Sequence, residues 1–313
     1  MKLTSKHLLT CLIAGFVFSL SSISQTKSQD LKPITELFES DDIIKITLRS
    51  NFNYILSYRS EDREYQKADL IYEDENGFHE IDVKVESRGN FRRDSGNCDF
   101  PPLRLNFKKK DIKNTIFEGQ EKLKIVTHCK EAFPEFIQYI FREYQVYKTY
   151  NLITDYSFRV RMTMIMYQDT DEVIPSITNY AFFIEDDDAL AERHNMDKID
   201  EKIQLTDLEP NNALTLALFE FMIGNTDWIV PFKKNLEIIG YGNKIIAVPY
   251  DFDYTKTVNI DYNKYGATIP LWPASRKYKG LCYNHETFEK AFKEFLDQKK
   301  PIYKEIRKSP YLN

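Results

Sequence analysis

The feature that most constrains the fold is a series of short runs, early in the chain, in which apolar and polar residues alternate. Such alternation is typical of half-buried strands, whose side chains point to opposite faces in turn. The runs cover residues 43–49, 69–72, 78–87, 103–107 and 123–127. Because segment 73–77 has the composition of a tight turn, the second and third runs are predicted to form a hairpin. The first part of the chain is therefore predicted to be a mostly antiparallel sheet.

Helical periodicity first becomes convincing at residues 133–150. Apolar residues recur there at three- and four-residue intervals, and Glu143 falls on the same face as Ile140 and Tyr147. The predicted elements that follow are strands at 158–167 and 179–184, a polar linker from Glu185 to Lys202, a buried helix at 212–223, strands at 235–239 and 245–248, and a tail helix at 286–308 broken at Pro301. This order predicts a β-rich N-terminal lobe, residues 41–188, joined by a hinge to a helical lobe, residues 189–313.

The first residues have the pattern of a secretory signal peptide. Lys2 and Lys6 precede an almost uncharged apolar run at 8–20, and a small-residue site ends at Ser24. We expect cleavage after residue 24, a flexible segment at 25–40, and export to the periplasm or the extracellular space. Cys11 is interpreted as part of this signal and not as a lipid anchor. No later stretch approaches the ~20 apolar residues of a membrane helix, so we expect no stable membrane insertion.

Charge and cysteine usage narrow the range of partners. The net charge of −5 argues against a nucleic-acid surface, which needs a basic stripe. Three cysteines remain after signal removal, and an oxidising compartment would allow one disulfide with one thiol left over. Cys98 and Cys129 are the favoured pair because each flanks a strand-like run, which leaves Cys282 unpaired. The alternative that all three are unpaired stays open.

The densest group of candidate site residues lies between Gly224 and Asp253. A loop presents Asp227, Asn235 opens a strand, and the partner strand ends at Asp251 and Asp253. Pairing of the two strands would bring these side chains together. Phosphoryl transfer needs such a set: one carboxylate for the attacking hydroxyl, and an amide oxygen with a second carboxylate for Mg²⁺. The alternative is that Asp227 caps a turn and that Asp251 and Asp253 are solvated residues at a strand end.

This stretch resembles the spore coat protein H (CotH) kinase family, a secreted branch of the atypical protein-kinase-like fold. Residues 248–253 (VPYDFD) match the family's apolar-x-Asp-x-Asp segment. Residues 88–93 (RGNFRR), followed by 101–107, resemble its Arg-Gly-Asn segment and basic strand, and residues 180–185 resemble the strand that leads to its hinge. The similarity spans residues 84–254.

The resemblance implies an α+β, two-lobed atypical protein-kinase-like fold with a β-rich N-terminal lobe and a helical C-terminal lobe. It also implies a site that binds ATP with Mg²⁺ or Mn²⁺. The roles it implies are Asp227 as the catalytic residue, Asn235 and Asp251 with Asp253 as metal ligands, Arg88 and Arg104 facing the phosphates with Lys124 as an alternative, Glu143 orienting one of these cations, and Glu185 beside the adenine.

The sequence departs from ordinary protein kinases at three points. Asp227 and Asn235 stand farther apart, Arg104 occupies a position where Lys is usual, and residues 88–90 replace a Gly-rich loop. The leading hypothesis is an exported kinase that phosphorylates a hydroxyl of a secreted or envelope protein. The alternatives are a catalytically inactive module that binds a surface protein or glycan, and a transferase that moves the nucleotidyl group instead.

Overall fold

The computed structural model describes residues 34–266 and 276–309. The predicted signal peptide lies outside these residues. The strands of the first half are β1 (Ile44–Ser50), β2 (Gln66–Asp74), β3 (Gly77–Ser87), β4 (Leu103–Phe107), β5 (Lys122–Val126), β6 (Val160–Asp169) and β7 (Ile177–Ile184). The predicted strands of this half are thus confirmed, with shifts of a few residues at their ends. A short helix, α1 (Phe52–Ser57), capped by the side chain of Asn51, was not predicted.

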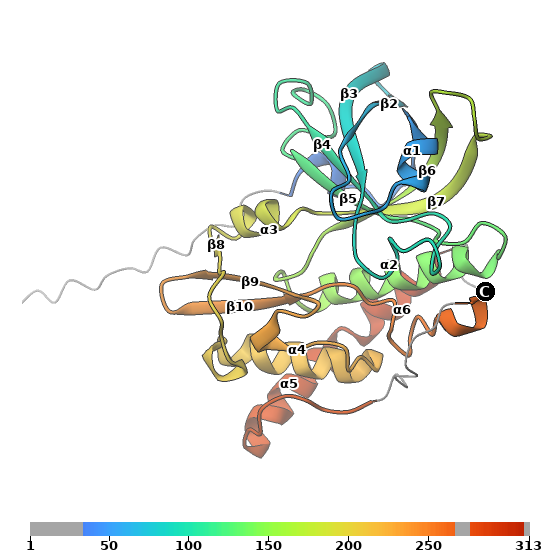
Figure 1. Ribbon diagram of the computed structural model, residues 1–313. Coiled ribbons are helices and arrows are strands. Elements are labelled where there is room, and N and C mark those ends of the chain that lie inside the picture. The colour runs from blue at the N-terminus through green and yellow to red at the C-terminus, as the bar shows by residue number, and fades with distance from the viewer. Residues whose placement is uncertain (1–33, 267–275, 310–313) are drawn as a thin grey trace, which may run out of the picture. The chain divides into compact units, whose positions relative to one another are not determined.

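These seven strands close into a barrel in the order β1-β2-β3-β4-β5-β7-β6 (Figure 1). Neighbouring strands are antiparallel except at the closure, where β1 runs parallel to β6 from the Ile44–Thr163 pair to the Ser50–Asp169 pair. The hydroxyl of Thr163 adds a hydrogen bond to the carbonyl oxygen of Ile44, at 2.9 Å. Alternation along each strand buries one face, and that face fills the barrel with residues such as Leu48 and Leu105.

The predicted fold class, a two-lobed atypical protein-kinase-like fold with a helical C-terminal lobe, is wrong. The first half is a closed mixed barrel. The later residues contain, beside their helices, a three-stranded sheet in the order β10 (Lys244–Pro249), β9 (Leu236–Tyr241) and β8 (Asp197–Lys198). The physical reason is that alternation determines which face of a strand is buried but not which strand becomes its neighbour. The pairing of β1 with β6 joins residues more than a hundred positions apart, and no local pattern announces it.

The helix α2 (Glu135–Ile153) confirms the first predicted helix. In Figure 1 it lies between the barrel and α4 (Pro210–Ile223). Its buried residues include Phe136, Ile140 and Tyr147, together with Glu143, as the spacing predicted. A carboxyl group on the apolar face of a helix loses hydration on burial, so its presence there indicates a polar site close by.

The segment after the barrel contains α3 (Asp187–Arg193), β8 (Asp197–Lys198), α4 (Pro210–Ile223), β9 (Leu236–Tyr241) and β10 (Lys244–Pro249). The predicted linker 185–202 therefore has structure of its own. Gly224 ends α4 in the left-handed conformation, φ +72°, and a Cβ there would lie 2.8 Å from Cβ of Lys256. Glycine at this position lets the chain turn directly into the loop that carries Asp227.

The tail forms two helices, α5 (His285–Asp297) and α6 (Lys299–Lys308). The predicted break at Pro301 is wrong, because the boundary lies at Gln298. Pro301 occupies the first turn of α6, where its missing N–H is tolerated. None of the helices in the described part of the chain has the length and apolar character needed to cross a bilayer.

The predicted disulfide is confirmed. Cys98 and Cys129 are bonded, and the exposed Cys282 is free. The bridge ties the loop between β3 and β4 to the chain just after β5. A structural disulfide fits an oxidising compartment, and therefore fits export.

Candidate functional site

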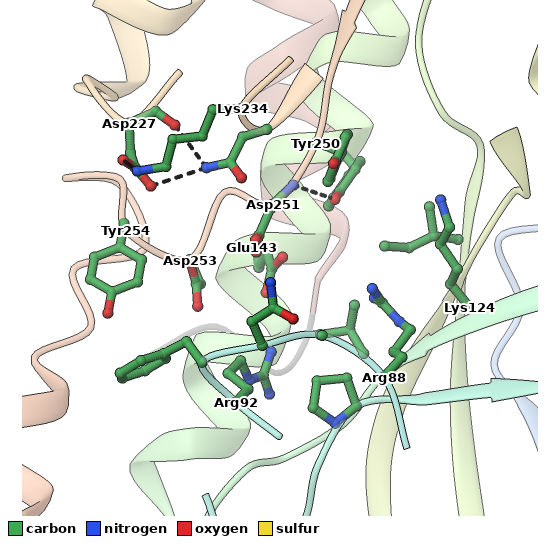
Figure 2. A pocket seen from close by; sticks show the side chains of 18 of the residues that line it. Arg88, Arg92, Lys124, Glu143, Asp227, Lys234, Tyr250, Asp251, Asp253 and Tyr254 are labelled. Atoms are coloured by element: carbon green, nitrogen blue, oxygen red, sulfur yellow. Dashed lines mark hydrogen bonds and ion pairs between the residues drawn. The ribbon is translucent and has the colours of Figure 1, made fainter. Parts of the chain in front are cut away.

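A pocket of about 610 Å³ opens between the barrel, α2 and the segment after α4 (Figure 2). Nearly all of the predicted site residues line it: Arg88, Arg104, Lys124, Glu143, Asp227, Asn235, Asp251 and Asp253. Glu185 does not line it. Figure 2 shows that carboxylates from one part of the chain face cations from another across this space.

Asp227 lies in the loop after α4, and its backbone is fixed from two directions. Its N–H donates to the side-chain oxygen of Asn225 at 2.8 Å, and its carbonyl oxygen accepts from Nδ2 of Asn235 at 2.7 Å. The same nitrogen donates to the carboxylate of Asp227 at 3.1 Å. Lys234 forms an ion pair with this carboxylate. The structure thus brings Asp227 and Asn235 into contact across their wide sequence spacing.

The turn between Asp227 and Asn235 explains how the wide spacing is bridged. Ile229 pairs with Lys234 in an isolated bridge, and the short helix η3 (Val230–Phe232) fills the turn between them. The residues between Asp227 and Asn235 therefore form a compact turn that folds back on itself. They leave Asp227 and Asn235 on the same side of the pocket.

Two of the site residues hold an uncommon backbone conformation. Asn235 has φ +55° and Asp251 has φ +64°, in the left-handed region that costs an L-residue free energy. Neighbouring contacts stabilise both: the carbonyl oxygen of Asn235 accepts from the N–H of Tyr250 at 3.1 Å, and the N–H of Asp251 donates to the hydroxyl of Tyr147 at 2.9 Å. Such conformations concentrate at functional sites, and here they turn the two side chains toward the pocket.

Three carboxyl groups meet at the floor of the pocket. Glu143 and Asp253 are buried, whereas the side chain of Asp251 lies deep but stays open to water through the pocket. Burial, strengthened by repulsion from Asp253, raises the pKa of Glu143 well above its usual range. Burial and the nearby Asp251 raise the pKa of Asp253 to about 7, although Tyr262 donates a hydrogen bond to it at 2.6 Å. The pKa of Asp251 is raised as well, mainly by its depth in the protein.

The opposite wall is cationic: Arg88 and Arg92 come from the loop between β3 and β4, and Arg104 comes from β4. Burial lowers the pKa of Arg88, although Asp251 attracts its charge. Burial also opposes the charge of Arg92, but attraction from Tyr262, Glu143 and Asp253 outweighs it and raises the pKa of Arg92. Within the described residues, the Nε–H groups of Arg88, Arg92 and Arg104 have no hydrogen-bond partner. Unpaired buried donors of this kind favour an anionic ligand.

Lys124 and Glu185 have different surroundings from each other. Lys124 is buried on β5, pairs with Asp187 and lies 5.2 Å from the centre of the Phe158 ring; burial lowers its pKa. Glu185 instead forms a buried ion pair with Arg193, with N–O distances of 2.8 and 2.9 Å. Glu185 was predicted to lie beside an adenine, but it is not one of the residues that line the pocket.

Sequence reasoning missed several residues of the site. Arg92 stood inside the RGNFRR motif but received no role, and Lys234 was overlooked beside Asn235. No sequence pattern pointed to Lys279, because it lies far from Asp227 along the chain. It donates to the carbonyl oxygens of Thr226, at 3.0 Å, and of Trp228, and so holds the backbone on both sides of Asp227.

The acidic side of the pocket offers a partial set of oxygen donors for a divalent cation. In residues 34–266 and 276–309, no three His, Cys, Asp or Glu side chains form a ready-made metal site. Mg²⁺ is usually held through one or two carboxylates, with substrate phosphates completing its shell. Asp251, Asp253 and the side-chain oxygen of Asn235 provide such a partial set, and the crowded carboxyl groups would gain from a divalent cation.

The chain matches no model of a known protein family and no curated protein.

Proposed function

We propose that the pocket binds a nucleoside triphosphate with Mg²⁺ or Mn²⁺ and transfers its terminal phosphoryl group to a hydroxyl of a secreted or envelope protein. This is the activity implied by the resemblance to the CotH family. The observation that carries the proposal is the division of charge across the pocket. Arginines with unpaired N–H groups form one wall, and carboxylates with an amide form the other. A triphosphate complexed with a cation carries both complementary charges.

On the cationic wall, Arg88 and Arg92 would donate to the phosphate oxygens. Guanidinium groups suit this role because their N–H groups match pairs of phosphate oxygens. Their loop is fixed by the Cys98–Cys129 disulfide and by a hydrogen bond from Arg92 to the carbonyl oxygen of Thr127. The donors would therefore meet the substrate with little reorganisation.

On the acidic wall, Asn235, Asp251 and Asp253 would hold the divalent cation. Nδ2 of Asn235 is occupied by Asp227, so its oxygen is the atom left for the cation. When bound, the cation supplies positive charge that neutralises the phosphate oxygens.

Asp227 would act on the acceptor. One carboxylate, fixed through its backbone and by Asn235 and Lys234, can accept the proton of a hydroxyl or orient that hydroxyl toward the phosphoryl group. Its side chain is 30% exposed, so an acceptor can reach it from solvent.

The test is Asp227→Asn, with the exposed Asp200→Asn as the matched control. The chain without residues 1–24 is incubated with γ-labelled ATP, Mn²⁺ or Mg²⁺ and a mixture of exported proteins. We expect Asp227→Asn to lower phosphate transfer by about 10²–10⁴-fold while nucleotide binding persists, because it removes the acid–base group alone. Asp200→Asn should transfer normally.

Three outcomes would overturn the proposal. Undiminished transfer by Asp227→Asn would show that this residue is not catalytic. Nucleotide binding without transfer to any acceptor would leave a binding module, and intact mass that shows an added AMP in place of a phosphate would establish nucleotidyl transfer.

A further inference from the structure

The surface of α5 and α6 has apolar residues that the rest of the described protein does not cover. Along these helices the inward side chains are Ala291, Phe295, Gln298, Ile302 and Glu305, all buried or half-buried. A second series lies one position further along, at Phe292, Leu296, Lys299, Tyr303 and Ile306, and is exposed. Both series follow intervals of four, seven, eleven and fourteen residues, which keep side chains on one face of a helix.

The two helices follow one another almost without interruption. Gln298 joins them in the right-handed helical region, with φ −81° and ψ −5°, and its carbonyl oxygen accepts from the N–H of Ile302 at 2.9 Å. Figure 1 shows α5 and α6 end to end. The exposed series can therefore form one continuous stripe, in which Phe292 is 49% exposed, Leu296 66% and Tyr303 51%.

A basic strip borders this apolar stripe. Five cations of α6, Lys299, Lys300, Lys304, Arg307 and Lys308, stand against the single carboxylate Glu305. Lys308 pairs with Glu305 and Asp41, and Lys299 lies over the ring of Tyr303. No carboxylate among the described residues pairs with Lys300, Lys304 or Arg307. Together with Tyr303 and Lys308 they line a hollow of about 400 Å³.

We propose that α5 and α6 form a docking surface for an anionic lipid bilayer, on which the protein lies without crossing it. An amphipathic helix with Lys and Arg beside exposed Phe, Leu and Tyr is typical of helices that lie in the membrane interface. The cations would contact lipid phosphates while Leu296 and Tyr303 enter the boundary of the acyl chains. This proposal does not depend on the function proposed for the pocket.

The charge of the surface favours a membrane over a second copy of the chain. A symmetric dimer whose axis crosses α6 would place the unpaired cations of the two copies against one another, whereas the phosphates of an anionic bilayer would pair with them. The strip also contrasts with the net charge of −5 of the whole chain, which indicates a local anionic partner.

The test is sedimentation of the chain without residues 1–24 with vesicles, because the apolar leader would bind lipid by itself. Vesicles of phosphatidylcholine alone are compared with vesicles that also contain phosphatidylglycerol. We expect binding to the phosphatidylglycerol vesicles only, weakened by salt. Each neutralised cation should weaken binding about fivefold, so Lys300→Gln/Lys304→Gln/Arg307→Gln should lose on the order of a hundredfold.

The matched control is Lys108→Gln/Lys109→Gln/Lys110→Gln, which removes the same charge from an exposed segment beside the barrel. It should bind like the unchanged chain, and Leu296→Ser/Tyr303→Ser should bind less while unfolding at the same temperature. Absence of binding to phosphatidylglycerol vesicles, or equal loss in both triple variants, would overturn the proposal. So would a stable dimer that Leu296→Ser/Tyr303→Ser dissociates, or binding to polyglutamate but not to vesicles.

Discussion

The two walls of the pocket differ in charge, in origin and in the way they are held in place. The barrel side supplies Arg88, Arg92, Arg104 and Lys124, and the segment after α4 supplies Asp227, Asn235, Asp251 and Asp253. Burial disfavours the charged groups of each wall, and repulsion between groups of like charge adds to this cost, as the raised pKa of Asp253 shows. Each wall is thus unfavourable alone, and a ligand with both anionic oxygens and a cation would relieve both.

The cationic wall is held by a covalent bond, whereas the acidic wall is held by backbone geometry. Between β3 and β4 the chain has no long regular element, and the Cys98–Cys129 bond fixes it. On the other side, the β9–β10 hairpin and the left-handed residues Asn235 and Asp251 fix the carboxylates. Loss of the disulfide should therefore disturb the cationic wall, whereas changes to the β9–β10 hairpin or its left-handed residues should disturb the acidic wall.

The largest expected effect comes from removing the disulfide. The bonded residues are 31 positions apart, and a loop of that length corresponds to roughly 3–4 kcal/mol of stability in the chain-entropy account. We expect Cys98→Ser/Cys129→Ser to lose about this much free energy of unfolding in denaturant titration, and to bind nucleotide less tightly. Cys282→Ser is the control and should change neither. If Cys98→Ser/Cys129→Ser binds nucleotide as tightly as the unchanged chain, the disulfide does not hold the cationic wall in place, and this part of the account is wrong.

The next prediction compares the loss of nucleotide affinity when either of two arginines of the cationic wall is replaced. Arg88→Gln should weaken nucleotide binding by about 10- to 150-fold, because a hydrogen bond to a charged group contributes ~1.5–3 kcal/mol. Arg104 lies farther out, with a side chain that is 36% exposed and 3.8 Å from Glu86. Its change to Gln should therefore cost less, as measured by calorimetric titration. A larger loss for Arg104→Gln would place the phosphates at the outer end of the wall.

The smallest effect is a pH dependence that arises in the acidic wall. The pKa of Asp253 is raised to about 7 in the ligand-free protein, so below pH 7 this carboxyl carries a proton that a bound cation must displace. Affinity for the metal–nucleotide should rise with pH up to about 7, by at most ~10-fold per pH unit, and then level off. The same shift means that the stability of the ligand-free fold falls as pH rises from about 4 to about 7 and levels off above that.

Calorimetric titration at several pH values checks this dependence, with Asp253→Asn as the control that should flatten it. A slope that persists unchanged in Asp253→Asn would assign the proton to another group, of which the buried Glu143 is the nearest candidate.

The residues that line the pocket were predicted partly from local patterns and partly from the resemblance to the CotH family, and the roles assigned to them stay predictions. Alternation located the strands, helical spacing placed Glu143 on the inner face of α2, and strand pairing brought Asp251 close to Asn235. Barrel closure could not be predicted, because the pairing of β1 with β6 is non-local. Glu185 was assigned to the pocket from the resemblance to the CotH family, and nothing local indicated its ion pair with Arg193.

The central claim is tested most directly by thermal unfolding of the chain without residues 1–24, with and without ATP and Mn²⁺ or Mg²⁺, beside Asp251→Asn. Asn tolerates the left-handed backbone at position 251, so this variant removes charge and leaves the turn intact. We predict a metal-dependent rise of the midpoint, with ~2.7 kcal/mol of stabilisation at a hundredfold excess over Kd, that is lost in the variant. No rise with any nucleotide, or an equal rise in Asp251→Asn, would contradict the account.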